Sequence, residues 1–236
     1  MSPRALLRLL PVLVLLAVGV RPVAAQVPSS APFSTPNEAA AYMFPYLNQY
    51  WFAQFFGSDD GLDYDLLVEY HLYDTQFDWA AVHRCPLPVP DDAALYCPPE
   101  QTIFVDRHLV EYFAADYGPW VTAYAMAHEW GHHIQWTILN DMYMASTTNA
   151  ELSKFMELQA DCFAGAALRP LYDNGILLAH DIATLSAFAN RLGDDRGTGA
   201  APAPIAQLGD HGVGSERMAW FEHGFKGGNF ATCMPS

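Results

Sequence analysis

Apolar residues in the middle of the chain recur at the three-to-four-residue spacing of a buried helix face. Between residues 120 and 139 the positions on one broad face are Trp120, Tyr124, Ala127, Gly131, Gln135 and Ile138. Pro119 comes directly before this run and suits the first position of a helix. The pattern therefore predicts a long helix over this segment, so polar residues within it belong to a largely buried element.

Similar patterns predict helices elsewhere in the chain. One helix begins after residues 35–38, and its aromatic residues between positions 42 and 56 are expected to pack in the core. Another begins near Thr148, because Thr148 and Glu151 have capping-box spacing, and it is expected to end or kink near Pro170. Further helices are predicted over 181–192 and about 215–225.

Only one short segment has the alternation of a strand. Residues 101–106 (QTIFVD) are β-branched, aromatic and polar in turn. The expected fold class is therefore α+β and mainly helical, with a small β-sheet.

The first 25 residues have the pattern of an export signal. Arg4 and Arg8 precede an apolar run over 9–20, and the small residues 23–25 offer a cleavage site before Gln26. The run is shorter than the roughly 20 residues that a membrane span needs, so cleavage is favoured over an uncleaved anchor. We expect a flexible leader over 26–36, a single domain over 37–236, and a secreted or extracytoplasmic protein of the periplasm or cell envelope.

The net charge limits the possible partners. The formal charge is −15, and removal of three signal-segment arginines leaves 8 basic and 26 acidic residues, or about −18. Such an acidic surface argues against nucleic acid and anionic membrane as partners.

The sequence HEWGHHIQW at 128–136 lies within the long predicted helix. His128 and His132 are four residues apart, so their Cβ atoms lie about 5–6 Å apart on one face. Two imidazoles at that separation can bind one ion at about 2.0–2.1 Å. His133 is rotated by about 100° from His132, so we expect it to pack or hydrogen-bond locally.

A catalytic zinc site needs a third protein ligand and an acid–base group. Glu129 in an H-E-x-x-H helix is placed to accept a proton from metal-activated water without binding the metal. Glu157, on the next predicted helix, is the best candidate for the third ligand, and Glu151 is its rival. Asp161, four residues after Glu157, is placed to hydrogen-bond the second nitrogen of a ligand histidine.

Four segments resemble those of a known bacterial family. AMAHEWGHHIQ, MELQADCFAGAAL, LYCPPEQTIFVD and HGVGSERMAWFEHGFKGGNFATC are similar to segments of the bacterial "putative neutral zinc metallopeptidase" family, in the same order, and cover most of the chain from about residue 85. That family resembles the gluzincins. The resemblance implies a zincin-like domain with an HExxH active-site helix, Zn²⁺ bound by His128, His132 and Glu157, and Glu129 as the catalytic base. The ending Met-Pro-Ser departs from the acidic, hydroxyl-bearing tail that is frequent in the family.

Four cysteines in an exported chain favour disulfides. Cys85 and Cys97 flank a proline-rich loop, so a local bridge between them is the simplest pairing and leaves Cys162 to pair with Cys233. Cys162 and Cys233 both lie in segments that resemble the family, which supports this pairing. The alternatives are two buried free thiols, or a cysteine zinc site, which the absence of any CxxC pair disfavours.

The remaining candidates concern the oxyanion and the substrate. His211 lies in a glycine-rich loop within a family-like segment and is the candidate oxyanion stabiliser, with a loop or capping role as the alternative. His223 is a weaker candidate. Zincin architecture suggests that strand 101–106 is an edge strand to which an extended peptide adds.

These observations predict an exported zinc metallopeptidase that acts on a peptide or protein substrate. Two alternatives remain at this stage. One is a non-catalytic zinc-containing binding or structural protein. The other is a metal hydrolase that acts on a non-peptide amide or ester.

Overall fold

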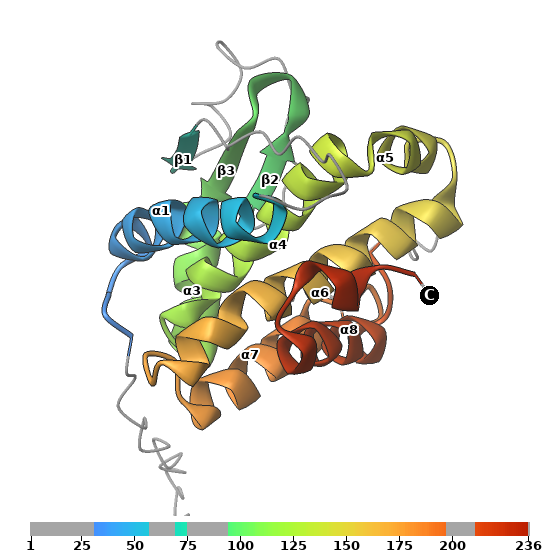
Figure 1. Cartoon of the computed structure of the whole chain (residues 1–236). Coiled ribbons are helices and arrows are strands. Elements are labelled where there is room, and N and C mark those ends of the chain that lie inside the picture. Colours follow the sequence, from blue (N-terminus) through green and yellow to red (C-terminus); the bar gives the residue numbers. More distant parts are fainter. Residues whose placement is uncertain (1–30, 57–68, 75–93, 197–210, 236) are drawn as a thin grey trace, which may run out of the picture.

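The computed structural model describes residues 31–56, 69–74, 94–196 and 211–235 (Figure 1). Seven α-helices and a three-stranded sheet make up these residues, so the predicted mainly helical α+β class is confirmed. The α-helices are α1 (Pro36–Phe55), α3 (Arg107–Tyr117), α4 (Trp120–Ile138), α5 (Asn140–Ser146), α6 (Ala150–Asp173), α7 (Ala179–Arg191) and α8 (Gly214–Gly227). The strands are β1 (Glu69–Tyr73), β2 (Ala94–Cys97) and β3 (Thr102–Asp106), and short 3₁₀ helices are η1 (Pro98–Glu100) and η3 (Phe230–Cys233).

Helix α4 lies at the centre of the molecule. It contacts α1 and strands β2 and β3 as well as α6, and α6 in turn packs against α8 (Figure 1). Nearly every residue of α4 from Trp120 to Gln135 is buried, including the polar ones. The predicted apolar face is therefore only part of a helix that is enclosed on most sides.

The sheet differs from the sequence-based expectation in its strand order. Strand β3 lies in the middle, parallel to β1 and antiparallel to β2. The expectation that 101–106 forms an edge strand is therefore wrong. A four-residue connection over 98–101 folds β2 back onto β3, and β1 pairs with the other side, so β2 is the edge strand that contacts α4.

Two helix boundaries also differ from expectation. Helix α6 is capped by the Asn149 side chain, which accepts a hydrogen bond from the backbone N–H of Leu152, whereas the Thr148 hydroxyl donates to the Ala145 carbonyl. The helix also continues through Pro170 to Asp173. Burial of Leu171 and a hydrogen bond from the Asn174 backbone N–H to the Pro170 carbonyl stabilise this last turn.

The N-terminal helix α1 has the predicted start. Thr35 and Glu38 form a reciprocal capping box, and Trp51 and Phe55 are buried in the core. Before the helix, the Phe33 ring packs edge-on against Trp120, the first residue of α4, with ring centroids 4.8 Å apart. Residues 1–30, which include the predicted signal and the start of the predicted leader, lie outside the described residues.

A disulfide joins Cys162 of α6 to Cys233 of η3, as predicted. The bridge fixes the C-terminal segment, residues 228–235, to the helix that carries Glu157. Cys85 lies outside the described residues, so its pairing with Cys97 stays a prediction. Across the described ranges, no helix has both the length and the apolar character that a bilayer span requires.

Candidate metal centre

Helices α4 and α6 bring the two motif histidines to one carboxylate. The Nε2 atom of His128 lies 3.2 Å from Glu157 Oε2, and the Nε2 atom of His132 lies 3.3 Å from Glu157 Oε1. His128 and His132 are one helical turn apart on α4, and Glu157 faces them from the second turn of α6. The three side chains that the sequence nominated as ligands therefore converge.

The geometry and chemistry of this group fit a zinc ion. One donor atom from each of the three residues lies within 4.8 Å of the others. Two imidazole nitrogens and one carboxylate oxygen are a donor set that catalytic zinc sites use, with a fourth position open to water or substrate. The same atoms are close enough to form hydrogen bonds with one another in the metal-free protein, so protons and a metal ion compete for them.

Asp161 holds the far side of the His128 ring. Its Oδ1 atom lies 2.8 Å from His128 Nδ1, and it accepts a further hydrogen bond from the Tyr124 hydroxyl. The Arg217 guanidinium, from α8, donates two hydrogen bonds to the same carboxylate, at 2.8 and 3.0 Å. Because all three partners donate to the carboxylate, Nδ1 of His128 carries a proton, so Nε2, which faces Glu157, is the nitrogen that can bind a metal ion.

Charge around the site shifts the pKa values of its members. Burial by itself would raise the pKa of Asp161, but Arg217 and His128 lower it to about 2. Burial would lower the pKa of His128, but the carboxylates of Asp161 and Glu157 raise it to about 10. Against the effect of burial, His132 and His128 hold the pKa of Glu157 well below its usual value, and the charge of His211 lowers it further. These side chains thus form a compact group of opposite charges.

Glu129 lies beside the two histidines and outside the three-residue group. Its side chain is buried, and burial raises its pKa, while the charges of His132 and His128 and a hydrogen bond from the Tyr96 backbone act in the opposite direction. A buried carboxyl with a raised pKa has the properties of a general acid–base group. Tyr96 belongs to β2, so the edge strand of the sheet contacts this carboxylate directly.

The other candidates from the sequence have different positions. His133 is fully buried and its Nδ1 atom lies 2.9 Å from the Tyr96 hydroxyl, so it packs locally as expected. Glu151 is exposed in the first turn of α6. His223 lies 3.0 Å from the Thr232 carbonyl and belongs to the C-terminal segment.

His211 lies near the centre and has an acidic neighbour. Its Nδ1 atom lies 3.3 Å from Asp194 Oδ1, and its backbone N–H donates to Asp194 Oδ2. His211 is close enough to Glu157 to lower its pKa. The side chain of His211 is 42% exposed, so it lies at the solvent side of the centre.

Several residues that complete the site were not nominated from the sequence. They are Tyr124, Gln135, Tyr143, Asp194 and Arg217. Gln135 was predictable in principle, because it lies three residues after His132 on the same helix. Tyr143 of α5 lies close enough to Glu129 and Glu157 for their charges to affect it. Burial and these two charges raise its pKa to about 12.

Comparison with known proteins gives a family match over the same region. The family model described as "Putative neutral zinc metallopeptidase" matches residues 81–235, which include all three candidate ligands. No solved structure matches the chain.

The names of two curated relatives state no function. "Uncharacterized protein YpfJ" of Escherichia coli (strain K12) is 31% identical over 150 residues, which cover 58% of this chain and 52% of the relative. "Uncharacterized protein Mb2605" of Mycobacterium bovis is 31% identical over 163 residues, which cover 58% of this chain and 53% of the relative. The chain thus spans about half the length of the curated relatives it matches.

Proposed function

The chain belongs to the "putative neutral zinc metallopeptidase" family, and from that premise we propose that it is an exported zinc metallopeptidase that hydrolyses peptide bonds. The observation that carries the proposal is the convergence of His128, His132 and Glu157 next to a buried Glu129. Three ligands leave a coordination position open, whereas a purely structural zinc site normally has four protein ligands.

Each residue has a distinct part in the proposed reaction. When bound, zinc polarises the scissile carbonyl and lowers the pKa of a water molecule. Glu129 accepts the proton of that water and delivers it to the leaving amine. The raised pKa of the Glu129 carboxyl suits both steps, because it makes the carboxylate a better proton acceptor than an ordinary glutamate while the acid form can still release the proton.

The developing oxyanion needs a hydrogen-bond donor at the solvent side of the centre. We assign this role to the His211 imidazolium, whose Nδ1 atom faces Asp194 and whose positive charge already acts on Glu157. Tyr143 is a second donor, because its raised pKa keeps the phenol protonated at neutral pH. An extended substrate would add to the edge strand β2, because β2 contacts both α4 and Glu129 whereas β3 is paired on both sides.

Glu129→Gln tests the proposal, because it keeps the size of the side chain and removes the basic carboxylate. Zinc content is expected to remain at one per chain, while turnover of a quenched pool of unstructured peptides at neutral pH falls by about 10²–10⁴-fold. Zinc content is measured by metal analysis, and turnover by fluorescence.

The other outcomes separate the alternatives. Unchanged peptide turnover in Glu129→Gln would remove Glu129 from the mechanism. Joint loss of zinc and activity would make Glu129 a ligand or a structural residue. If zinc-loaded wild type cleaves no peptide but hydrolyses small amide or ester substrates, the metal-hydrolase alternative replaces the peptidase, and no hydrolysis of either class favours a binding or structural protein.

A further inference from the structure

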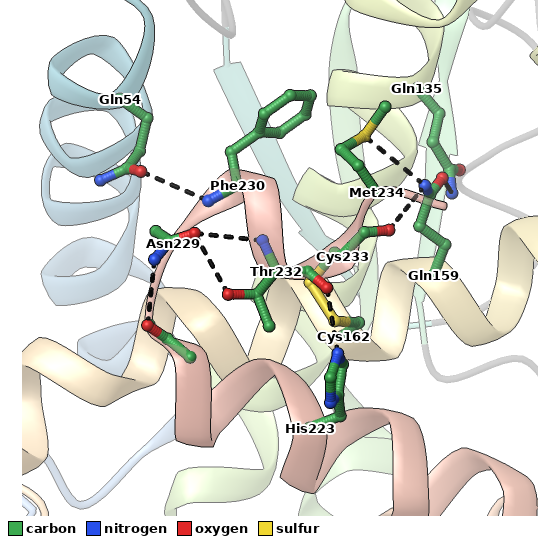
Figure 2. Close-up of a disulfide and its surroundings, with 12 residues drawn as sticks. Gln54, Gln135, Gln159, Cys162, His223, Asn229, Phe230, Thr232, Cys233 and Met234 are labelled. Atoms are coloured by element: carbon green, nitrogen blue, oxygen red, sulfur yellow. Dashed lines mark hydrogen bonds between the residues drawn. A yellow bond between two sulfur atoms is a disulfide. The ribbon is translucent and has the colours of Figure 1, made fainter. Parts of the chain in front are cut away.

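A chain of hydrogen bonds, partly buried at His132 and fully buried beyond it, connects His132 to the C-terminal segment. His132 Nδ1 lies 2.8 Å from Gln135 Oε1, Gln135 Nε2 donates to Gln159 Oε1 at 3.1 Å, and Gln159 Nε2 donates to the Cys233 carbonyl at 3.0 Å. Figure 2 shows the two glutamines side by side, with Gln159 directed at Cys233 and Met234. Both glutamines are fully buried, and Cys233 is 1% exposed. We refer to His132, Gln135, Gln159 and the Cys233 carbonyl as the amide relay.

Backbone carbonyls fix the direction of every hydrogen bond in the amide relay. The Cys233 carbonyl can only accept, so the amide nitrogen of Gln159 must face it and Oε1 must face Gln135. Gln135 Nε2 also donates to the Met156 carbonyl at 2.7 Å, so neither of its partners can take the amide oxygen. Gln135 Oε1 is therefore left to face His132, and an oxygen acceptor requires a proton on His132 Nδ1.

This direction determines which nitrogen of His132 can bind a metal. With a proton fixed on Nδ1, Nε2 is the nitrogen that can bind a metal ion, and Nε2 is the atom that lies 3.3 Å from Glu157. The reversed relay would put two amide oxygens against backbone carbonyls and would protonate Nε2. Such buried acceptor–acceptor contacts leave polar groups without hydrogen bonds and destabilise the reversed arrangement.

The far end of the amide relay is fixed covalently. Cys162 lies three residues after Gln159 on α6, on the same helix face, and its disulfide holds Cys233 against that face (Figure 2). The bridge therefore sets the position of the carbonyl that accepts from Gln159.

We propose that Gln135 and Gln159 are positioning residues, which transmit the placement of the disulfide-bound C-terminal segment to His132 and hold its ring in the metal-binding tautomer and orientation. This inference rests on the proposed role of His132 as a zinc ligand. The two histidines that would bind the same ion are thus oriented by different groups. A charged carboxylate holds the His128 ring, whereas neutral amides hold the His132 ring, and a disulfide fixes the backbone carbonyl at the end of those amides.

The first test measures zinc affinity by competition with a chelator. Gln135→Met and Gln159→Met keep side-chain volume and remove the amide, and each is expected to weaken zinc binding about 10–100-fold, the usual effect of losing a group that orients a metal ligand. Gln54→Met is the matched control. It removes the acceptor of the Phe230 backbone N–H (Figure 2), which is another hydrogen bond to the C-terminal segment but is not part of the amide relay, so its zinc affinity should equal that of wild type.

The second test asks whether the disulfide and the glutamine act through one path. Cys162→Ser/Cys233→Ser should also weaken zinc binding. When it is combined with Gln159→Met, the two effects on log Kd should be clearly less than additive, because either change interrupts the same relay. Full additivity would show that the disulfide acts on the centre by another route and would overturn the proposed transmission.

A measurement on wild-type protein covers the case in which a methionine variant does not fold. In zinc-loaded protein with ¹⁵N-labelled histidine, the Nδ1 proton of His132 should exchange slowly with water because it is held in the hydrogen bond to Gln135 Oε1. Rapid exchange, or wild-type zinc affinity in the folded methionine variants, overturns the amide relay while leaving the zinc site in place. A different result would contradict the proposed function itself, namely that the wild-type protein binds no zinc.

Discussion

At the scale of single residues, the centre consists of buried and partly buried polar side chains that are joined by hydrogen bonds. Asp161 accepts from His128, Tyr124 and Arg217, and this charged network crosses from α4 through α6 to α8. Removing one member of such a network leaves a buried charge without its partner, which typically costs 3–5 kcal/mol. The network therefore both orients a ligand and joins three helices.

Zinc content should depend on Glu157 and not on Glu151. Glu157→Ala removes the carboxylate that lies 3.2–3.3 Å from both imidazole nitrogens, so most of the bound metal should be lost. Glu151→Ala is the control, because the exposed Glu151 contributes no atom to the group. Metal analysis after dialysis against a weak chelator measures the difference, and equal zinc content in the two variants would contradict the ligand assignment.

At the scale of elements, the ligand positions depend on how closely α4 and α6 approach each other. A Cβ atom at Gly131 would lie 2.8 Å from the Cα atom of Ala160, closer than real contacts allow. Gly131 is adjacent to His132 on α4, and Ala160 lies between Glu157 and Asp161 on α6. The small residue thus sets the helix separation at the level of the metal centre.

Gly131→Ala should therefore weaken zinc binding. Overpacking of this kind costs about 1–3 kcal/mol, offset by up to about 1 kcal/mol from the better helix propensity of alanine. The shift in helix spacing should lower zinc affinity by about tenfold or more, as measured by chelator competition. Gly175→Ala is the matched control: its φ of +70° makes alanine strained, but nothing lies within 4 Å, so stability should fall without a change in zinc affinity.

The sequence was informative about elements where local physical rules dominate. The period of apolar residues predicted the helix at 120–139, and the helical pattern after residues 35–38 predicted α1, which the structure starts at Pro36. Strand order could not be predicted, because β1 (EYHLY) contains no β-branched residue to mark it as a strand and its pairing with β3 is a long-range contact. Pro170 was misjudged for a similar reason, since tertiary burial of Leu171 outweighs the loss of one helical hydrogen bond.

Within the site, sequence spacing predicted what lies on one helix better than what meets across helices. His128 and His132 follow from helical periodicity alone, and Glu157 and Asp161 follow from the same rule once the second helix is assumed. Arg217 and Asp194 approach from segments that are distant in sequence, and no spacing rule connects them to the motif. Only the packing of α8 on α6 brings Arg217 to Asp161.

At the scale of the whole molecule, the disulfide closes a large loop around the centre. Cys162 and Cys233 are separated by 71 residues, and that loop contains α7, α8 and the His211 segment. In the chain-entropy description, a bridge over a loop of this size stabilises the folded state by about 4 kcal/mol, because it restricts the unfolded chain. An oxidising compartment, which the predicted export signal would provide, is where such a bridge persists.

Removal of this bridge should accordingly lower the free energy of unfolding by about 4 kcal/mol. The comparison is between wild type and Cys162→Ser/Cys233→Ser, both metal-free in the presence of a chelator, so that lost zinc binding does not add to the effect. Urea unfolding followed by circular dichroism measures the difference, and peptide mapping of the oxidised wild type first establishes that Cys162 is linked to Cys233 and Cys85 to Cys97.

Cys85→Ser/Cys97→Ser provides the control, because it leaves the C-terminal segment attached to α6. A loss below about 1 kcal/mol in Cys162→Ser/Cys233→Ser would mean that helix packing alone holds α8 and η3 in place, and that the bridge acts mainly through the position of the Cys233 carbonyl.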